Sequence, residues 1–231
     1  LTEYVMSPWP GCRYETTVAW PAASPPVRQV GQYDLIEILG RGGMGVVWKA
    51  IHRHLGQTVA VKFLSPDSWS DPQAVARFYR EMKAAGRVSH PNVVRAYDAG
   101  QYDGQHILVM ECIEGRNVRD ILAGQGTLSV PVACEILRQA SAGLSAISAA
   151  GMVHRDLKAS HLFVNTEGVV KIRDLGLARF HVDAAEADLT VSGNLLGTID
   201  YMAPEQSSDP REVDVRSDLY SLGCTLYALL A

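Results

Sequence analysis

A cluster of glycines between two strand-like runs constrains the fold more than any other feature of this 231-residue sequence. The cluster, Gly40–Gly45, follows a strand-like run that begins at Tyr33 and leads directly into another at Val46–Ala50. A third run, Thr58–Leu64, alternates its side chains between two faces, which is the period of a β-strand. We therefore expect a three-stranded meander with a glycine loop between its first two strands.

Later segments follow a helical pattern. Ser70-Asp71-Pro72 is typical of a helix start, because it offers a capping residue and an early proline. A longer helix is expected from Ser129, a capping residue type, to Gly151. Further strands are expected at 93–97 and 107–110, and a hairpin at 162–172. Strands first and helices later predict an α+β fold of two lobes, a small sheet and a helical part.

The composition excludes several protein classes. Apolar residues at 47% and charged residues at 20% rule out a mostly disordered or fibrous chain. A net charge of −4 argues against a nucleic-acid partner. The four cysteines are far apart, without the spacing of a zinc site, and are expected to be free thiols. The longest apolar stretch, Leu219–Ala231, is shorter than the roughly 20 residues of a membrane span, so we expect a core helix there and no membrane segment in this chain.

The glycine cluster also suggests a phosphate-binding loop. Gly40, Gly42, Gly45 and Val47 fit the pattern G-x-G-x-x-G-x-V, and glycines let backbone N–H groups approach phosphate oxygens closely. A dinucleotide-binding loop would open a helix, and a Walker A loop would need Gly-Lys-Ser/Thr, which is absent. The remaining interpretation is a strand–loop–strand lid over a nucleotide.

Four charged residues extend this interpretation. Lys62 lies in the middle of an expected strand, and Glu81 lies at the margin of the buried stripe of the helix that follows. A carboxylate there favours a partner such as this lysine, although Lys62 alone would fit a solvent-facing edge strand. Asp156 and Asp174 lie in turns on either side of the expected hairpin, which suggests one base and one magnesium ligand. Taken singly, each would fit an ordinary turn.

The order of these features resembles that of Hanks-type protein kinases, and among them the bacterial serine/threonine kinases. The resemblance extends from about Tyr33 to the last residue. It rests on Gly-Gly-Met-Gly-Val-Val (42–47), Val-Ala-Val-Lys (59–62), His-Pro-Asn-Val-Val (90–94), His-Arg-Asp-Leu-Lys (154–158), Asp-Leu-Gly (174–176), Met-Ala-Pro-Glu-Gln (202–206) and Ser-Asp-Leu-Tyr-Ser-Leu-Gly (217–223).

The resemblance implies a two-lobed kinase fold. Residues 1–31, which hold five of the 11 prolines, are expected to form an irregular leader. The N-lobe is expected over 32–110 and the C-lobe over 111–231. Since the family's large lobe continues beyond the helix that begins near Ser217, the C-lobe is expected to be incomplete and the chain truncated.

The resemblance further implies transfer of phosphate from ATP, with Mg²⁺, to serine and threonine hydroxyls of proteins. Lys62, held by Glu81, would bind the α- and β-phosphates. Asp156 would accept or orient the substrate's hydroxyl proton, Lys158 would neutralise the γ-phosphate, and Asp174 would bind magnesium. The other residues expected around the nucleotide are Leu39, Gly40, Arg41, Gly42, Gly43, Met44, Gly45, Val47, Ala60, Met110, Glu111, Ile113 and Phe163.

One position departs from the family pattern. His161 stands where the motif H-R-D-L-x-x-x-N has its asparagine, a ligand of a second magnesium ion. Nitrogen is a poorer partner than oxygen for Mg²⁺. The substitution therefore predicts weakened catalysis, a metal preference shifted towards Mn²⁺, or a nucleotide-binding pseudokinase; the expected truncation adds an inactive fragment as a further alternative.

Regulation follows from the same resemblance, and the expected location from the free thiols, which are typical of a reducing compartment. Arg155 beside Asp156 suggests control by a phosphate on the intervening loop, because arginine binds phosphate well. Thr190 and Ser192 are the candidate acceptors, with ordinary loop hydroxyls as the alternative. The expected location is the cytoplasm, with an anchor beyond residue 231 left open, and the pattern indicates no oligomeric state.

Overall fold

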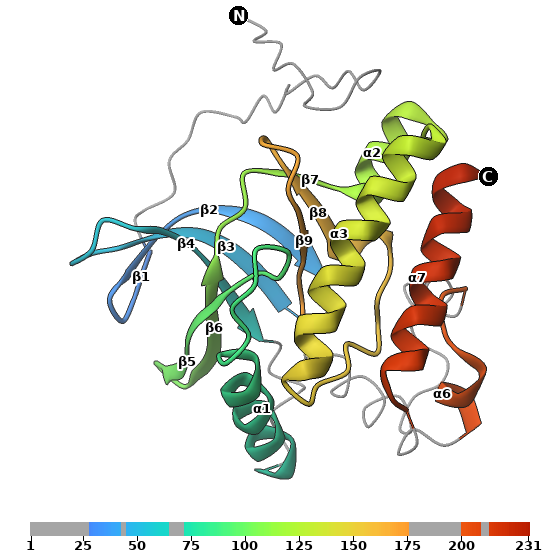
Figure 1. Ribbon diagram of the computed structural model, residues 1–231. Coiled ribbons are helices and arrows are strands. Elements are labelled where there is room, and N and C mark those ends of the chain that lie inside the picture. The colour runs from blue at the N-terminus through green and yellow to red at the C-terminus, as the bar shows by residue number, and fades with distance from the viewer. Residues whose placement is uncertain (1–27, 43–44, 65–71, 176–199, 209–212) are drawn as a thin grey trace, which may run out of the picture. The chain divides into compact units, whose positions relative to one another are not determined.

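The computed structural model describes residues 28–42, 45–64, 72–175, 200–208 and 213–231 (Figure 1). These residues form two compact units. The unit called here the sheet unit contains the described residues up to Gly86 together with Arg95–Cys112. The helical unit contains Arg87–Val94 and the described residues from Ile113 onward.

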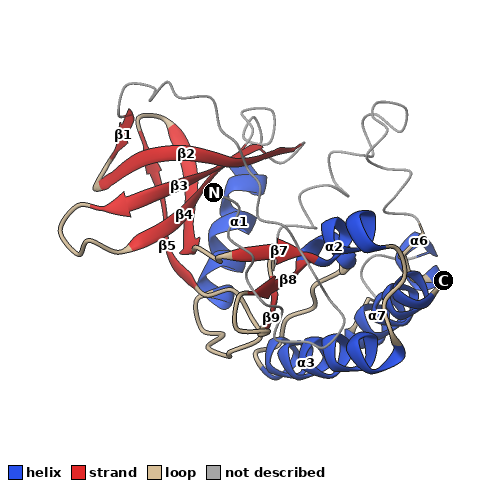
Figure 2. Ribbon diagram, turned by 90° about the horizontal axis from the view of Figure 1, so that it is seen from above, coloured by secondary structure: helices blue, strands red, loops and turns tan. Residues whose placement is uncertain are grey.

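The sheet unit is built on six antiparallel strands in the order β1-β2-β3-β4-β6-β5, and helix α1 contacts β5 (Figures 1 and 2). The bounds are β1 (Arg28–Val30), β2 (Tyr33–Gly42), β3 (Gly45–His52), β4 (Thr58–Leu64), α1 (Pro72–Ala85), β5 (Ala96–Tyr102) and β6 (Gln105–Glu111). The expected meander is therefore confirmed as β2, β3 and β4.

The glycine loop joins β2 to β3, where Gly42 pairs with Gly45. Gly45 has a φ of 121°, a conformation that residues with a side chain rarely adopt. A Cβ atom at this position would lie 1.8 Å from the backbone oxygen of Phe63. Only glycine fits here, because β3 and β4 approach each other closely at this point.

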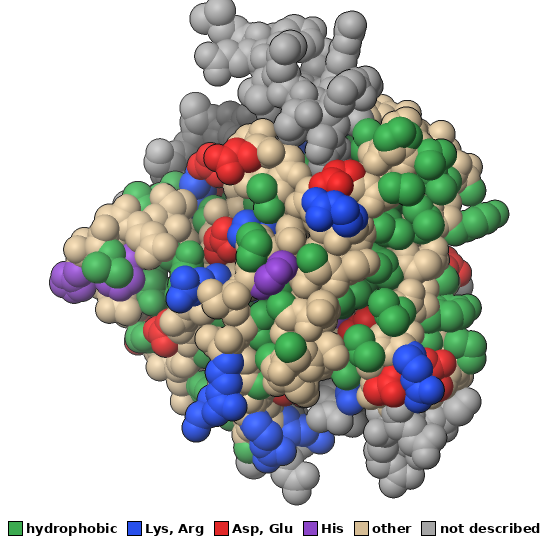
Figure 3. Space-filling model, in the orientation of Figure 1, with side chains coloured by type: hydrophobic (Ala, Val, Ile, Leu, Met, Phe, Trp, Pro, Cys, Tyr) green, Lys and Arg blue, Asp and Glu red, His purple; other side chains and the backbone are tan. Residues whose placement is uncertain are grey.

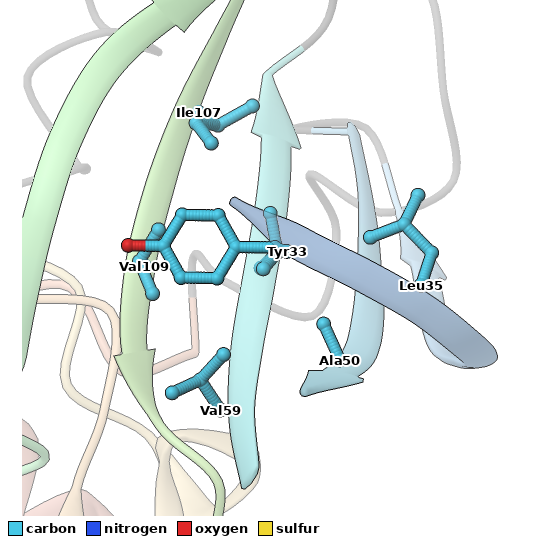
Figure 4. Packing of buried hydrophobic residues seen from close by; sticks show 7 residues of the cluster. Tyr33, Leu35, Ala50, Val59, Ile107 and Val109 are labelled. Carbon is cyan, nitrogen blue, oxygen red and sulfur yellow. The ribbon is translucent and has the colours of Figure 1, made fainter. Parts of the chain in front are cut away.

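One face of the sheet carries the core of this unit. The side chains of this core cluster come from β2, β3, β4 and β6, and Figure 4 shows the Tyr33 ring extending across the strands towards Val109. Full burial of one large aliphatic or aromatic side chain contributes about 1.5–3 kcal/mol. The cluster consists of Tyr33, Leu35, Ala50, Val59, Val61, Ile107 and Val109.

In its described residues, the helical unit combines three helices of eight or more residues and one of five with a small antiparallel sheet of order β7-β8-β9. Helix α3 packs against α7 and β9 (Figure 1). The bounds are β7 (Gly115–Asn117), α2 (Val118–Gln125), α3 (Val130–Ala149), a 3₁₀ turn (Ala159–His161), β8 (Leu162–Asn165), β9 (Val170–Ile172), α6 (Pro204–Ser208) and α7 (Val215–Leu230).

The long helix and the hairpin lie close to where the pattern predicts them. Helix α3 begins after Ser129, which occupies the N-cap position without a side-chain capping bond. Gly151, just past its end, has a φ of 74°, which suits the glycine that ends a helix. The expected hairpin at 162–172 is β8 and β9.

The strand expected at 93–97 is wrong in its first half. Strand β5 begins only at Ala96, and the segment before it belongs to the helical unit. There Val93 forms a parallel bridge with Ile172, and the N–H of Val94 donates to the carbonyl of Ile172. The backbone of an apolar segment can form its hydrogen bonds in either unit. Hydrophobic periodicity alone therefore did not predict which unit this segment joins.

Asn92 attaches this segment to the rest of the helical unit. Its side-chain amide donates to Gln139 Oε1 (3.0 Å) and to the carbonyl of Val170 (2.8 Å). Helix α3 approaches the same segment at Gly143, where a Cβ atom would lie 2.7 Å from the carbonyl oxygen of Asn92. The contact between helix and segment thus requires a glycine.

Helix α7 carries an exposed apolar face. Leu222 is buried, but Tyr227 is 75% exposed, and Figure 3 shows apolar side chains gathered on the side of the molecule where α7 lies. A groove of about 450 Å³ between α3 and α7 is lined by residues that include Leu144, Val215 and Leu219. Within the described ranges, no helix is both long and apolar enough to cross a membrane.

Candidate active site

Asp156 and Lys158 form an ion pair in the loop between α3 and the 3₁₀ turn. The Lys158 Nζ atom lies 3.1 Å and 2.9 Å from the two carboxylate oxygens of Asp156. Both side chains are largely but not fully buried. The loop therefore presents an acceptor and an ammonium group within one hydrogen bond of each other, while the separate roles expected of the two residues stay predictions.

His154 joins this loop to the segment that carries Asp174. Its ring Nε2 lies 2.9 Å from the carbonyl oxygen of Arg173, and its Nδ1 accepts from the backbone N–H of Asp156 at 3.4 Å. Because a carbonyl oxygen can only accept, Nε2 carries the proton and Nδ1 is left as the acceptor. His154 thus holds the backbone of Asp156 from one side.

Asp218 in α7 holds the same loop from the other side. Its carboxylate accepts hydrogen bonds from the backbone N–H groups of His154 (2.8 Å) and Arg155 (2.7 Å). Burial raises the pKa of the Asp218 carboxyl, and these two donors oppose that shift. Arg155 has a φ of 70°, which is unusual for a residue with a side chain. The carboxylate therefore stabilises a backbone conformation that the loop would otherwise seldom adopt.

Gln206 connects the loop to residues 202–206, the segment with the sequence Met-Ala-Pro-Glu-Gln. Its amide nitrogen donates to the carbonyl of Arg155 at 2.7 Å, and its amide oxygen accepts from the N–H of Ala203 at 3.0 Å. Arg155, the residue before Asp156, thus has its backbone N–H bonded to Asp218 and its carbonyl bonded to Gln206.

His161 and Asp174 lie beside Asp156 in this unit. Each side chain is only 8% exposed, and His161 Nε2 lies 3.9 Å from Asp174 Oδ2. His161 Nδ1 lies 2.6 Å from the carbonyl oxygen of Asp156. Burial lowers the pKa of His161 to about 4, against the opposing effect of Asp174 and Asp156. The imidazole is therefore neutral at pH 7.

Arg173 is a neighbour of Asp174 that sequence reasoning missed. Its Nε atom lies 3.0 Å from Asp174 Oδ2, and its guanidinium carbon lies 4.9 Å from the centre of the Phe163 ring. The Phe163 ring is thus in contact with the guanidinium group of Arg173, the residue just after β9. The expected role of Phe163 beneath adenine stays a prediction.

The sheet unit brings together a second set of expected residues. Val47 pairs with Lys62 across β3 and β4, and Ala60 pairs with Met110 across β4 and β6. Directly paired residues share a face of a sheet, as do residues two apart on one strand. Val47, Ala60, Lys62 and Met110 therefore lie on one face, opposite the core cluster. Lys62 is only 4% exposed, so it is not the solvent-facing lysine of the alternative interpretation.

The other expected residues are placed as follows. Glu81 lies on α1 with its Oε2 atom buried, and its expected pairing with Lys62 stays a prediction. Strand β2 carries four of the residues expected around the nucleotide, Leu39, Gly40, Arg41 and Gly42. Gly45 begins β3, Glu111 ends β6, and Ile113 belongs to the helical unit. Four further expected residues lie outside the described part of the chain: Gly43, Met44, Thr190 and Ser192.

Asp174 offers the oxygen ligand that Mg²⁺ prefers, and His161 offers a nitrogen. No group of three or more His, Cys, Asp and Glu side chains within the described part of the chain could hold a metal ion. The residues present therefore fit a divalent cation that takes its remaining ligands from phosphate oxygens and water.

Sequence reasoning found Asp156, Lys158, His161 and Asp174, but it assigned no role to Asp218. No local signal marked it, because Asp218 follows Arg216 and Ser217 in the first turn of α7, where acidic residues are common. Gln206 carried no such signal either.

The comparisons with known proteins identify the family of the chain. Residues 33–231 match the family model described as protein kinase domain. Similar relatives include a probable serine/threonine-protein kinase PknB of Bifidobacterium longum (38% identical over 209 residues, 87% of this chain and 30% of that protein) and serine/threonine-protein kinase PknD of Mycobacterium tuberculosis (38% over 198 residues, 86% and 29%). The chain thus spans about a third of the length of the curated relatives it matches.

Solved structures agree as well. A crystal structure of the PknI kinase domain of M. tuberculosis is similar with a TM-score of 0.73 and 26% identity, over 90% of this chain and 76% of that one. The expected two-lobed α+β kinase fold and the resemblance to bacterial serine/threonine kinases are confirmed. The chain belongs to the protein kinase domain family.

Proposed function

We propose that this chain transfers the γ-phosphate of ATP to serine and threonine hydroxyls of proteins. The observation that carries the proposal is the Asp156–Lys158 ion pair, 2.9 Å long, on a loop whose backbone is held by Asp218 and Gln206. Such fixing supports catalysis because phosphoryl transfer depends on positioning and charge stabilisation more than on covalent chemistry of the protein.

The reaction assigns a task to each charged group. The substrate hydroxyl oxygen forms a bond to the γ-phosphorus while the bond from that phosphorus to the β–γ bridging oxygen breaks, which leaves ADP. Asp156 orients the hydroxyl and takes its proton, and Lys158 neutralises charge on the transferring group. Asp174 would hold a divalent cation, which would supply charge neutralisation at the phosphates.

The sheet unit would bind the nucleotide. Lys62 would contact the α- and β-phosphates with the support of Glu81, while Val47, Ala60 and Met110, on the same sheet face, would contact adenine. We place the nucleotide-binding lobe at 32–110 and the substrate lobe at 111–231. Phosphorylation at Thr190 or Ser192 would regulate the activity.

Transfer from radiolabelled ATP to a serine- and threonine-rich test protein checks the proposal. Wild type should label the acceptor and Asp156→Asn should not, while Asp103→Asn, an equivalent change in the exposed β5–β6 turn, should label as wild type does. If Asp156→Asn labels the acceptor as well as wild type, the activity is a contaminant and the proposal fails.

A nucleotide-binding pseudokinase is the second candidate, favoured by His161 in place of the expected asparagine. This candidate predicts that ATP raises the thermal unfolding midpoint of the protein without being turned over. It also predicts that His161→Asn does not restore phosphate transfer. A clear rise in rate in that variant would contradict it.

A further inference from the structure

Tyr79 and His106 join helix α1 to strand β6 by a hydrogen bond. The Tyr79 hydroxyl oxygen lies 2.9 Å from Nδ1 of His106. The two rings also meet edge to face, with centroids 5.7 Å apart and planes at 63° to each other. His106 is only 8% exposed, so water competes little for this bond. The bond is therefore a directional contact between the helix and the sheet.

His106 lies on the sheet face that carries Lys62. Lys62 pairs with Leu108 across β4 and β6, and His106 is two residues from Leu108 on the same strand. Residues that pair directly, or that lie two apart on one strand, share a face of the sheet, and two residues span roughly 7 Å along a strand. The bond from Tyr79 thus attaches α1 to the face on which Lys62 lies.

Tyr79 and Glu81 lie on opposite margins of the buried stripe of α1. At about 100° per residue, Tyr79 is about 100° to one side of Phe78 and Glu81 about 60° to the other. Both side chains are only partly buried, as the margins of a stripe should be. A rotation of α1 that separates Tyr79 from His106 would therefore also move the Glu81 carboxylate across the sheet face. The stripe itself consists of Phe78, Met82 and Ala85.

Apolar contacts alone define such a rotation poorly. The burial of Phe78 and Met82 stabilises the helix on the sheet, but the hydrophobic effect has no preferred direction. The hydrogen bond from Tyr79, in contrast, weakens steeply when its donor angle or its length changes. The bond therefore restricts the rotation of α1 in a way that the buried stripe does not.

We propose that Tyr79 and His106 are positioning residues for the binding of the nucleotide's phosphates. Their bond sets the rotation of α1 at which the Glu81 carboxylate meets the Lys62 ammonium group. This inference rests on the proposed function, in which Lys62, supported by Glu81, contacts the α- and β-phosphates. Because the pair acts through the helix and Glu81, it affects the binding of phosphates and leaves the binding of adenine unchanged.

Calorimetry of ADP and adenosine binding tests this role, because adenosine has no phosphate to meet Lys62. Tyr79→Phe removes only the hydroxyl group. In excess Mg²⁺ it should weaken ADP binding about fivefold, which corresponds to about 1 kcal/mol for one typical hydrogen bond. Its affinity for adenosine should equal that of wild type. Tyr97→Phe, the same change at a tyrosine that is 42% exposed, should leave both affinities unchanged.

Changes at His106 distinguish the hydrogen bond from the packing of the ring. His106→Leu removes the partner and should weaken ADP binding as much as Tyr79→Phe does, and the double variant should bind ADP no more weakly than either single variant. His106→Asn keeps an amide that can donate or accept near the position of Nδ1, so it should recover most of the affinity. Losses that add in full would show that the two residues do not act as a pair.

A variant of Glu81 tests whether the pair acts through this carboxylate. Glu81→Gln should weaken ADP binding by itself, and Tyr79→Phe should then cause no further loss. An equal further loss in the Glu81→Gln protein, or an equal loss of adenosine affinity in Tyr79→Phe, overturns the inference. The thermal unfolding midpoint without nucleotide shows that each variant is folded, and His106→Gln replaces His106→Leu if the latter is not.

The outcomes separate this inference from the proposed phosphate transfer, because ADP binding needs no turnover. Equal ADP affinity in wild type and Tyr79→Phe overturns the positioning role even if Asp156-dependent transfer is present. The expected pattern of ADP affinities supports the positioning role even if transfer is absent, and in that case the transfer proposal alone fails. A wild-type protein that does not bind ADP contradicts both.

Discussion

The carboxylate of Asp218 accepts a hydrogen bond of 2.7 Å from the backbone N–H of Arg155, a residue 63 positions earlier in the chain. The same carboxylate accepts from the N–H of His154. A buried carboxylate on α7 thus holds the loop that carries Asp156, and the rigidity of that loop depends on a residue far away in sequence.

Asp218→Ala should destabilise the protein by roughly 3 kcal/mol, since each hydrogen bond to a charged group contributes about 1.5–3 kcal/mol and the two N–H groups would lose their acceptor. Urea denaturation measures the loss. Asp214→Ala, which removes an exposed capping aspartate of the same helix, should cost clearly less. Equal losses in the two variants would show that Asp218 acts as an ordinary helix residue.

Gly143→Ala and Gly223→Ala should change stability in opposite directions. At Gly143 in α3 a Cβ atom would lie 2.7 Å from the Asn92 carbonyl oxygen and 2.9 Å from Ile172 Cδ1, and such overpacking costs about 1–3 kcal/mol. At Gly223 in α7 an added Cβ atom would have no neighbour within 4 Å among the described residues beyond the adjoining chain, so the variant should gain about 0.5–1 kcal/mol from helix propensity. Thermal or urea unfolding compares the pair, and stabilisation by Gly143→Ala would refute the close contact.

Gln206→Met should slow phosphate transfer more than it weakens nucleotide binding. The variant keeps the side-chain length but loses the bonds to the Arg155 carbonyl and the Ala203 N–H, at a cost of about 1 kcal/mol for each typical hydrogen bond. We expect kcat to fall while KM for ATP stays near the wild-type value. An unchanged kcat would show that this bridge does not position Asp156.

His106 should titrate below the ordinary histidine pKa of about 6.5. Burial lowers its pKa, and the neutral ring lies 2.9 Å from the Tyr79 hydroxyl through Nδ1. Since the pKa is lower in the folded state than in the unfolded state, the stabilisation is fully present above about pH 6.5 and is lost as pH falls through the folded pKa.

The midpoint of His106 is measured by NMR titration, and the effect on stability by urea denaturation at pH 7.5 and pH 5. His106→Gln should lose less stability than wild type between these two pH values. A midpoint at or above about 6.5 would contradict the prediction.

Much of the sheet and the choice of candidate catalytic residues follow from the sequence alone. The alternation of Thr58–Leu64 and the positive φ of Gly45 are local signals, because strand period and positive φ depend on a residue and its immediate neighbours. The roles expected of Asp156 and Lys158 came from the resemblance of His-Arg-Asp-Leu-Lys (154–158) to the family's motif.

Only the tertiary structure decided which unit the segment before β5 joins and which protons the histidines carry. Val94 bonds to Ile172 although its own pattern suits a strand of the sheet unit, and the tautomers of His154 and His161 follow from backbone carbonyls that each ring meets in the folded chain. Asp218 likewise gains its role from two N–H groups more than sixty residues away. Periodicity describes neighbours along the chain, whereas these choices depend on hydrogen-bond partners that folding brings together.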